Sequence, residues 1–431
     1  MRTAFLRLAL VGLAAILPSF AAERAVIDRL MEMARSQPNS AEFRAELIKA
    51  MGEENVQKAA AIAGNGPDFV WALEAESQPK LYVDEAPAAG AFRRIKSTNT
   101  WFYFGKLQTG TAHKFHYVID GKVVGGANDI PAYTPDSYQK PDVPRGALSE
   151  KQTHISKIYE GMETNYWVYV PAQYDASKPA ALMVWQDGER FNARNTEDNC
   201  NLCPSLYRVH EVTDNLIHQS KIPVMIHLFI SPGTKDGRPM RSIEYDSVSD
   251  KYPRFLLDEI LPELYAKYNI RRDAYSRAIQ GQSSGGICAF NAGWRHPEEF
   301  SRIATHIGTF VALALRNGEP EAGHLYPTWV RRDEKKNLRV WISDNSDDQE
   351  NRLGSWPLQN IQMANSLKLR DYDFRFEFGG GTHHAAIWAA MLPEALTWLW
   401  RDYDPAKTEQ IYVQDPEEKE KPVFRVKLAN R

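Results

Sequence analysis

The feature of the sequence that most constrains the fold is the pattern Gly281-x-Ser283-x-Gly285. In this pattern a serine sits on a strained turn between a strand and a helix, and glycine fits the flanking positions because side chains there would collide. The neighbouring residues agree with this interpretation. Residues 275–279 predict a short strand, and the small and apolar residues 286–294 predict a helix. The alternative interpretation is a surface loop rich in glycine and serine.

The same alternation of strands and helices extends over residues 151–403. An antiparallel pair opens this segment, at residues 155–159 and 166–171. Apolar runs predict further strands at residues 180–185, 224–230, 302–307, 338–342 and 374–378, and segments between them predict helices at residues 206–218, 252–268, 356–369 and 385–400. Strands that alternate with helices form a mostly parallel sheet with both faces covered. The segment is therefore predicted to be an α/β domain.

The regions before and after residues 151–403 have different sequence patterns. Residues 1–21 indicate a signal peptide, because basic residues precede an apolar run too short to span a membrane, so a secreted or periplasmic protein is expected. Residues 22–62 predict a helical N-terminal extension. Residues 63–135 contain short β-rich runs between glycine turns, which predict a small β-sandwich, and residues 136–150 form a proline-rich linker. Residues 404–431 are predicted to be a C-terminal tail, with a solvated charged cluster at residues 417–421.

Composition argues against several classes of function. Lys and Arg number 52 and Asp and Glu 55, without a long basic run, so no nucleic-acid partner is expected. No later apolar segment is long enough to span a membrane. Most histidines are scattered and the three cysteines lack the spacing of a zinc site, so neither a metal nor another cofactor is expected. Cys200 and Cys203 are candidates for a local disulfide in an oxidising compartment.

Two clusters of polar residues follow predicted strands and can serve a reactive serine. A serine hydroxyl needs a base to take its proton and a third group to orient that base. Ligand sites gather at the carboxyl ends of parallel strands, so the loops after strands 338–342 and 374–378 are expected beside Ser283. We prefer His383 as the base and Asp348 as the acid. The alternatives in the same loops are His384, Asp344 and Asp347.

Further residues are candidates for binding the reacting group. The backbone N–H groups of Ser284, directly after the serine, and of Gly188, in the loop after strand 180–185, are expected to stabilise a developing negative charge. Gly188 can also be interpreted as part of a simple turn. Four side chains are candidates for lining a substrate pocket: Trp185, Arg241, Glu244 and Trp356. Each of them can equally be explained by packing or by an ion pair, such as one between Arg241 and Glu244.

These motifs resemble one known family. Asp187-Gly188, Arg241-x-x-Glu244, Gly281 to Gly286, Asp347-Asp348 and Gly381-Thr382-His383 are similar to the "putative esterase" family, which contains enterochelin esterases, esterase D, and feruloyl and acetyl-xylan esterases. The resemblance covers roughly residues 150–403. It implies an α/β-hydrolase fold in which Ser283 is the nucleophile, Asp348 the acid and His383 the base. The preceding β-rich segment resembles the immunoglobulin-like domain, related to starch-binding modules, that is often found before such esterases.

The sequence and the resemblance together favour one function and leave two others open. The first hypothesis is an exported serine esterase that forms an acyl-enzyme and acts on feruloyl or acetyl esters, possible substituents of a plant polysaccharide. The runner-up is an esterase of a catecholate siderophore of the enterochelin type. A hypothesis of another class is a carbohydrate-binding protein with an inactive hydrolase fold. The sequence does not determine the oligomeric state.

Overall fold

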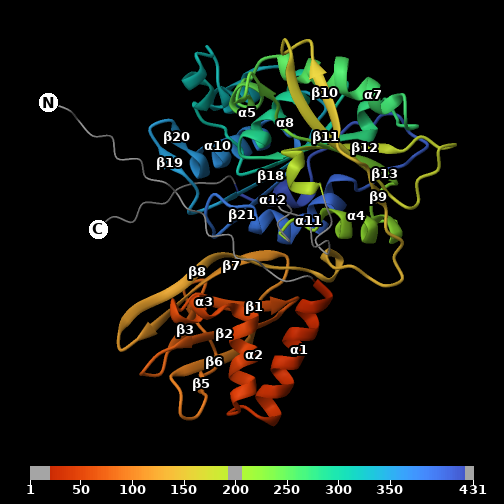
Figure 1. Ribbon diagram of the computed structural model, residues 1–431. Coiled ribbons are helices and arrows are strands. Elements are labelled where there is room, and N and C mark those ends of the chain that lie inside the picture. The colour runs from red at the N-terminus through yellow and green to blue at the C-terminus, as the bar shows by residue number, and fades with distance from the viewer. Residues whose placement is uncertain (1–19, 193–205, 423–431) are drawn as a thin grey trace.

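The computed structural model describes residues 20–192 and 206–422, and Figure 1 shows their arrangement. Most of the predicted signal peptide, and both Cys200 and Cys203, lie outside the described residues. Two units are stacked in Figure 1. Helices and two small sheets from residues 20–132 form the lower unit, and a large sheet flanked by helices forms the upper unit. Within the described ranges, no helix is long and apolar enough to cross a membrane.

The lower unit contains two four-stranded antiparallel sheets. Trp71 belongs to one sheet and Phe115 and Tyr117 to the other, and all three share a buried apolar cluster, so the two sheets pack face to face. The turn Asp120-Gly121 has two positive φ angles, 47° and 78°, as a type I′ hairpin requires. The first sheet has the spatial order β1 (Ala61–Asn65), β2 (Asp68–Glu74), β6 (Thr100–Lys106) and β5 (Arg93–Arg94). The second has the order β4 (Ala86–Pro87), β3 (Lys80–Val83), β7 (Thr111–Ile119) and β8 (Lys122–Ala132).

Three helices at the start of the described chain pack on the first of these sheets. They are α1 (Phe20–Ser36), α2 (Ala41–Met51) and α3 (Glu53–Gln57). Ser40 caps α2 by accepting the N–H of Phe43 at 3.0 Å. Phe43 then packs edge-to-face against Phe102 of β6, in a buried cluster shared by the helices and the sheet. The segment predicted as a helical extension therefore shares its core with the β-sheets.

The upper unit is built on an eleven-stranded sheet. Six strands run parallel, in the spatial order β13 (Met225–Ile230), β12 (Ala181–Gln186), β16 (Arg277–Gln282), β17 (Arg302–His306), β18 (Arg339–Asn345) and β21 (Asp373–Gly379). The remaining strands extend the β13 edge: β11 (Met162–Val170), β9 (Ala147–Leu148), β10 (Gln152–Ser156), β14 (Thr234–Lys235) and β15 (Arg238–Pro239). A separate short hairpin joins β19 (Glu350–Asn351) to β20 (Gly354–Ser355).

Helices cover both faces of this sheet, because alternate residues of each strand point to opposite sides. In β12, Leu182 and Val184 join one apolar core, whereas Met183 and Trp185 join another. The first core includes α8 (Ser284–Arg295), α9 (Tyr326–Arg332), α10 (Trp356–Leu369) and α5 to α7 (Arg241–Tyr245, Lys251–Phe255 and Leu261–Tyr265). The second includes α4 (Val209–His218) and α11 (Ala386–Leu399). The predicted α/β arrangement is confirmed.

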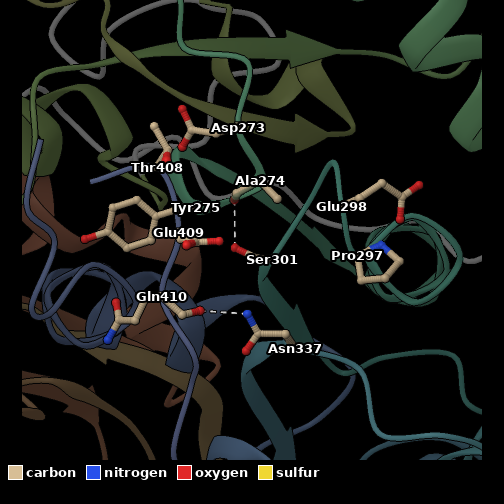
Figure 2. A pocket seen from close by; sticks show the side chains of 10 residues that line it. All are labelled: Asp273, Ala274, Tyr275, Pro297, Glu298, Ser301, Asn337, Thr408, Glu409 and Gln410. Carbon is tan, nitrogen blue, oxygen red and sulfur yellow. Dashed lines mark hydrogen bonds between the residues drawn. The ribbon is translucent and has the colours of Figure 1, made fainter. Parts of the chain in front are cut away.

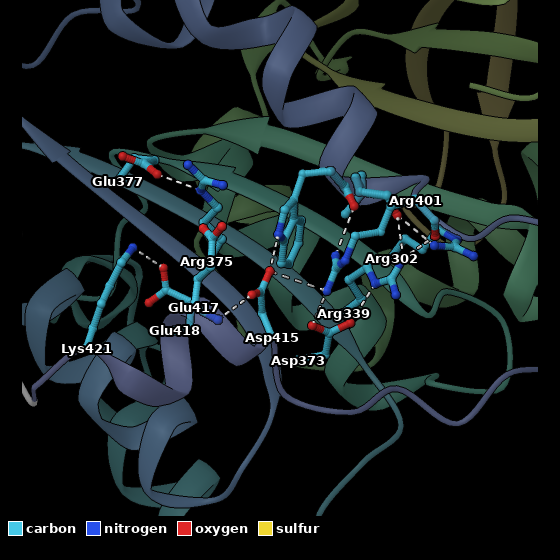
Figure 3. A network of polar contacts seen from close by, with 12 residues as sticks. Arg302, Arg339, Asp373, Arg375, Glu377, Arg401, Asp415, Glu417, Glu418 and Lys421 are labelled. Atoms are coloured by element: carbon cyan, nitrogen blue, oxygen red, sulfur yellow. Dashed lines mark hydrogen bonds and ion pairs between the residues drawn. The ribbon is translucent and has the colours of Figure 1, made fainter. Parts of the chain in front are cut away.

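The C-terminal segment is held against the amino ends of the parallel strands. Arg339 and Asp373, which begin β18 and β21, form a buried ion pair at 2.6 Å, and Arg401 contacts both Asp373 and Asp415 (Figure 3). Glu418, in α12 (Pro416–Glu420), is only 1% exposed. The prediction that residues 417–421 form a solvated cluster is therefore wrong for this residue, because its segment packs against the upper unit, where Lys368 donates to its carbonyl oxygen.

His227 gives the upper unit a pH-dependent stability. Its side chain is fully buried in β13 and accepts the indole N–H of Trp185 through Nδ1 at 2.9 Å. Burial lowers the pKa of His227 to about 3, whereas the unfolded chain has an ordinary histidine pKa of about 6.5. Between these two pKa values His227 is protonated in the unfolded chain but not in the folded protein. The free energy of unfolding therefore falls as the pH falls from about 6.5 towards 3.

We therefore expect the free energy of unfolding to fall less steeply with acidification in His227→Gln than in the wild type. Glutamine keeps an acceptor for Trp185 but has no proton to bind. The difference in slope should reach up to about 1.4 kcal/mol per pH unit between about pH 6.5 and pH 4.5. Urea unfolding followed by tryptophan fluorescence measures both slopes. Identical slopes would show that His227 is not the group responsible.

Candidate active site

Ser283 occupies the sharp turn between β16 and α8, at the carboxyl edge of the sheet. Its backbone has φ 54° and ψ −121°, a conformation that costs a non-glycine residue roughly 1–3 kcal/mol. The turn also brings the helix against the strand. A Cβ on Gly281 would lie 2.1 Å from the carbonyl oxygen of Gly285, which is far inside van der Waals contact. The glycine at this position is therefore required by the close approach that the sequence pattern predicted.

His383 reaches Ser283 from the loop between β21 and α11. Its Nε2 lies 2.8 Å from Ser283 Oγ, and its Nδ1 contacts Asp348 Oδ1. If Nδ1–H donates to the carboxylate, the Nε2 lone pair is free to accept the serine proton. The ring of Trp356 packs edge-on against the imidazole, with centroids 5.8 Å apart. His384, the alternative histidine, has an exposed side chain.

Asp348 and Asp344 carry their charges differently, although both carboxyl groups are buried. Burial disfavours the ionised form of Asp348, but hydrogen bonds from His383, Asp344 and the N–H of Gln349, with the charge of His383, together outweigh burial, so the pKa of Asp348 lies below its usual range. Burial, together with the adjacent Asp348, raises the pKa of Asp344 well above its usual range. Of the two carboxyl groups, Asp344 is therefore the one that binds a proton more strongly. Asp347, the third candidate, is turned outward and lies 3.5 Å from Lys114.

Two residues from neighbouring strands support the loop that carries His383. Asn345, at the end of β18, donates its Nδ2–H to the carbonyl oxygen of Thr382 at 2.7 Å. His306, at the end of β17, lies 3.1 Å from the carbonyl oxygen of His384 through Nε2. Only a protonated Nε2 can donate to a carbonyl, and burial lowers the pKa of His306 to about 4. The imidazole of His306 is therefore neutral, and its Nδ1 accepts from Ser343 Oγ at 2.9 Å.

The two residues predicted to supply backbone donors follow neighbouring parallel strands, Gly188 after β12 and Ser284 after β16. Ser284 is the first residue of α8, so its N–H has no acceptor within that helix. Gly188 begins a short 3-10 turn, η2 (Gly188–Phe191), directly after β12. A Cβ on Gly188 would lie 2.3 Å from the backbone of Phe229, so this glycine is required by close packing against β13. Gly285 lies close to the end of β12, because a Cβ on Gly285 would lie 3.0 Å from Gln186 Cβ.

The predicted pocket residues divide into two groups. Arg241 holds Asp187 with two hydrogen bonds, at 2.6 and 2.8 Å, and its side chain is 34% exposed. Trp356 contacts His383, as described above. The prediction that Trp185 and Glu244 contact a substrate needs correction, because both are fully buried. Trp185 belongs to the second core. Glu244 accepts the N–H of Gly233 at 2.7 Å instead of pairing with Arg241, and burial raises the pKa of Glu244 to about 8.

A chain of polar residues beside Ser283 was not found from the sequence. Arg190, in η2, donates to the hydroxyl of Tyr207 at 3.1 Å, and this hydroxyl donates to Gln282 Oε1 at 3.0 Å. Gln282 is the residue before Ser283, and Arg190 is exposed. Proximity of Arg190 to Gly188 in the chain was the one sequence signal that could have identified it. No group of residues in the two described ranges has the arrangement of a metal site.

A pocket of about 450 Å³ lies at the edge of the upper sheet opposite Ser283, and Figure 2 shows the residues that line it. Its walls come from residues that precede β16, β17 and β18, among them Tyr275, Ser301 and Asn337, and from the C-terminal segment at residues 408–410. These are the amino ends of the strands, whereas Ser283, His383 and Asp348 follow the carboxyl ends. The pocket is therefore separate from the candidate active site.

Comparison with known proteins gives one family and a set of similar folds. The model of the "Putative esterase" family matches residues 158–399. The ferric enterobactin esterase of Salmonella typhimurium is 16% identical, with a TM-score of 0.51, over 78% of this chain and 93% of that one. The Shigella flexneri enterobactin esterase, crystallised in the presence of enterobactin, is 15% identical, with a TM-score of 0.51 and the same coverage. A ferulic acid esterase of Anaeromyces mucronatus is 15% identical, with a TM-score of 0.46, over 61% of this chain and 94% of that one.

The charge state of Asp344 leads to a prediction about stability. Burial raises the pKa of Asp344 in the folded protein, whereas the unfolded chain ionises this carboxyl group above a pKa of about 3.9. The unfolded chain thus binds fewer protons than the folded one above that pH, so the wild type loses stability as the pH rises. Asp344→Asn removes this loss, and its amide can donate to Asp348. We expect the variant to be more stable than the wild type at about pH 7 and to lose that advantage near pH 4.

Chemical denaturation at these two pH values checks the prediction. Asp344→Ala serves as the matched control, because it removes the titrating group but leaves a cavity and an unpaired Asp348 oxygen. If the difference in stability between the asparagine variant and the wild type is the same at both pH values, the pKa of Asp344 is not raised in the folded protein.

Proposed function

Because the chain belongs to the "Putative esterase" family and is a carboxylic ester hydrolase, we propose that it cleaves its substrate through an acyl-enzyme formed on Ser283. One observation carries this proposal: the hydrogen-bonded series from Ser283 Oγ through His383 to Asp348. Each group in the series has the partner that its role requires. The serine has an imidazole acceptor, and the imidazole has a buried carboxylate that fixes its tautomer.

In the proposed first step, Ser283 Oγ forms a bond to the ester carbonyl carbon while its proton passes to Nε2 of His383. The electron pair of the carbonyl double bond moves to oxygen, and the backbone N–H groups of Ser284 and Gly188 donate to this oxyanion. Collapse of the intermediate breaks the bond to the alcohol, which takes the proton from His383. Water, deprotonated by the same imidazole, then attacks the carbonyl carbon of the acyl-enzyme. The bond to Ser283 Oγ breaks, His383 returns the proton to Oγ, and the carboxylic acid leaves. Asp348 stays ionised and stabilises the imidazolium.

Removal of any member of the series tests the mechanism. We expect Ser283→Ala and His383→Ala to lower kcat/KM for a p-nitrophenyl ester at least about 10,000-fold, and Asp348→Asn to lower it by a similar factor. Only the serine variant should also fail to label with a fluorophosphonate after prolonged exposure. His384→Ala is the matched control, because its side chain is exposed, and it should keep the wild-type rate. Full activity in Ser283→Ala, measured with contaminating esterase excluded, would disprove the proposal.

For the substrate, we propose a feruloyl or acetyl ester carried by a plant polysaccharide. The predicted signal peptide supports an exported enzyme. The paired β-sheets at residues 61–132 overlap residues 63–135, which the sequence predicts to be a β-sandwich similar to carbohydrate-binding modules. The proposed acyl-enzyme mechanism accommodates both acyl groups, since the chemistry acts only on the ester carbonyl.

A catecholate siderophore ester is a second candidate, favoured by the position of Arg190. This exposed side chain lies two residues after Gly188 and connects through Tyr207 to Gln282. Within the described residues Arg190 makes no ion pair with a carboxylate, whereas Arg241 is paired with Asp187. An exposed guanidinium close to the proposed oxyanion donors would attract an anionic substrate.

A substrate panel separates the two candidates. It contains methyl ferulate, acetylated xylan and an ester of 2,3-dihydroxybenzoyl-serine, assayed with the wild type and with Arg190→Met, which keeps side-chain length without charge. If the catecholate ester is the substrate, Arg190→Met should lower kcat/KM for that ester alone by about 10-fold or more, the worth of one charge-assisted hydrogen bond. A wild-type preference for methyl ferulate or acetylated xylan, unchanged in the variant, would eliminate the siderophore ester.

A further inference from the structure

We propose that the lower unit is part of the active site, and that Asp129 in β8 is a positioning residue for His383. This inference rests on the proposed role of His383 as the base. The Asp129 carboxylate accepts two hydrogen bonds from Thr382, the residue before His383. The N–H of Thr382 donates to Oδ1 at 3.0 Å, and its hydroxyl donates to Oδ2 at 2.5 Å. The two residues are 253 positions apart in the chain.

The sheet is distorted where it presents this carboxylate. His113 of β7 pairs with Ile130, and Phe115 pairs with Ala127, so β8 has one residue more than β7 between the two pairs. Asp129 lies in this β-bulge and has a left-handed backbone, with φ 57°. Bulges redirect a side chain and are frequent beside active sites. A regular strand without the bulge would alternate its side chains differently and would not present Asp129 in the same way.

Asp129 restrains groups of the histidine loop that the upper unit does not bind through Asn345 or His306. The carbonyl oxygen of Thr382 accepts from Asn345 of the upper unit, whereas the N–H and hydroxyl of Thr382 both donate to Asp129. Gly381 leaves room for this approach, because a Cβ there would lie 2.9 Å from Asp129 Oδ1. Without the Asp129 carboxylate, the strand-borne residues of the upper unit would restrain only the carbonyl groups on either side of His383.

The lower unit also contacts the loop that carries the acid. Lys114 of β7 lies 3.5 Å from Asp347, the residue before Asp348, and the N–H of Asp347 donates to the carbonyl oxygen of Gly381 at 2.9 Å. Ala112 of β7 belongs to the same apolar cluster as Ala385 and residues of α11, directly after the histidine loop. Both loops that meet at Ser283 are thus in contact with β7 and β8, which lie directly below the upper unit in Figure 1.

A positioning role predicts a particular kinetic effect. Asp129 does not touch Ser283, so its loss should displace the imidazole while leaving the substrate pocket in place. A displacement of about 1 Å at a reacting group can lower the rate about 100-fold. We expect Asp129→Ala to lower kcat for a p-nitrophenyl ester by a factor of about 10–100, to leave KM little changed, and to slow fluorophosphonate labelling of Ser283 by the same factor.

The double variant identifies the contact responsible. Thr382→Val removes the hydroxyl that donates to Asp129, which is one of the two hydrogen bonds that Asp129→Ala removes. We therefore expect Asp129→Ala combined with Thr382→Val to be no slower than Asp129→Ala alone. Thr382→Ser keeps the hydroxyl and should restore most of the rate that Thr382→Val loses. Multiplicative losses in the double variant would contradict the proposal, and the threonine series still tests it if Asp129→Ala fails to fold.

Glu74→Ala is the matched control in the lower unit. Glu74 accepts from Arg44 at 2.7 Å and Thr100 at 2.9 Å, far along the chain from both catalytic loops, so its loss should affect stability without changing kcat. Ser283→Ala separates a failure of the positioning role of Asp129 from a failure of the proposed acyl-enzyme mechanism. If Ser283→Ala is inactive while Asp129→Ala has the wild-type kcat, only the positioning role is overturned. If Ser283→Ala is active, the acyl-enzyme mechanism itself fails.

Discussion

The site depends on a hydrogen bond of 2.8 Å between Ser283 Oγ and His383 Nε2, which joins residues 100 positions apart. Parallel pairing makes this contact possible, because β16 and β21 end at the same edge of the sheet although β17 and β18 lie between them. The histidine loop must then extend back across two strands. His306 and Asn345 end those two strands and donate to carbonyl groups on either side of His383, so the intervening strands support the loop that crosses them.

Local pattern predicted much of this arrangement. The helix predicted at residues 356–369 coincides with α10, and the strand predicted at 374–378 lies within β21. Strand ends can be located from apolar runs, and the geometry of a parallel sheet gathers those ends, which is why Ser283, His383 and Asp348 were expected together. The same reasoning failed for Trp185. It lies near a strand end, but the alternation of side chains along β12 turns it into the core against His227.

Side-chain contacts between segments far apart in the chain could not be predicted from the sequence. The sequence left open whether Arg241 binds a substrate or pairs with Glu244, yet Arg241 pairs with Asp187, whose two carboxylate oxygens match the planar guanidinium. Likewise nothing in the pattern of β8 marks Asp129, because its importance arises only when the lower unit meets the Thr382 loop. A bulge adds one residue to a strand, and hydrophobic alternation alone does not reveal which residue it redirects.

Three buried carboxyl groups lie in or next to the loops that form the candidate site, and each is accommodated in a different way. Asp187 is paired with Arg241, Asp348 contacts His383, and burial raises the pKa of Asp344. An uncompensated carboxylate at this depth would raise the energy of a transition state that itself gains negative charge, because Coulomb interactions are strong where water is excluded. The arrangement therefore lets Asp348 stabilise an imidazolium, and the raised pKa of Asp344 disfavours a second negative charge beside it, which would oppose the charge that develops on the substrate.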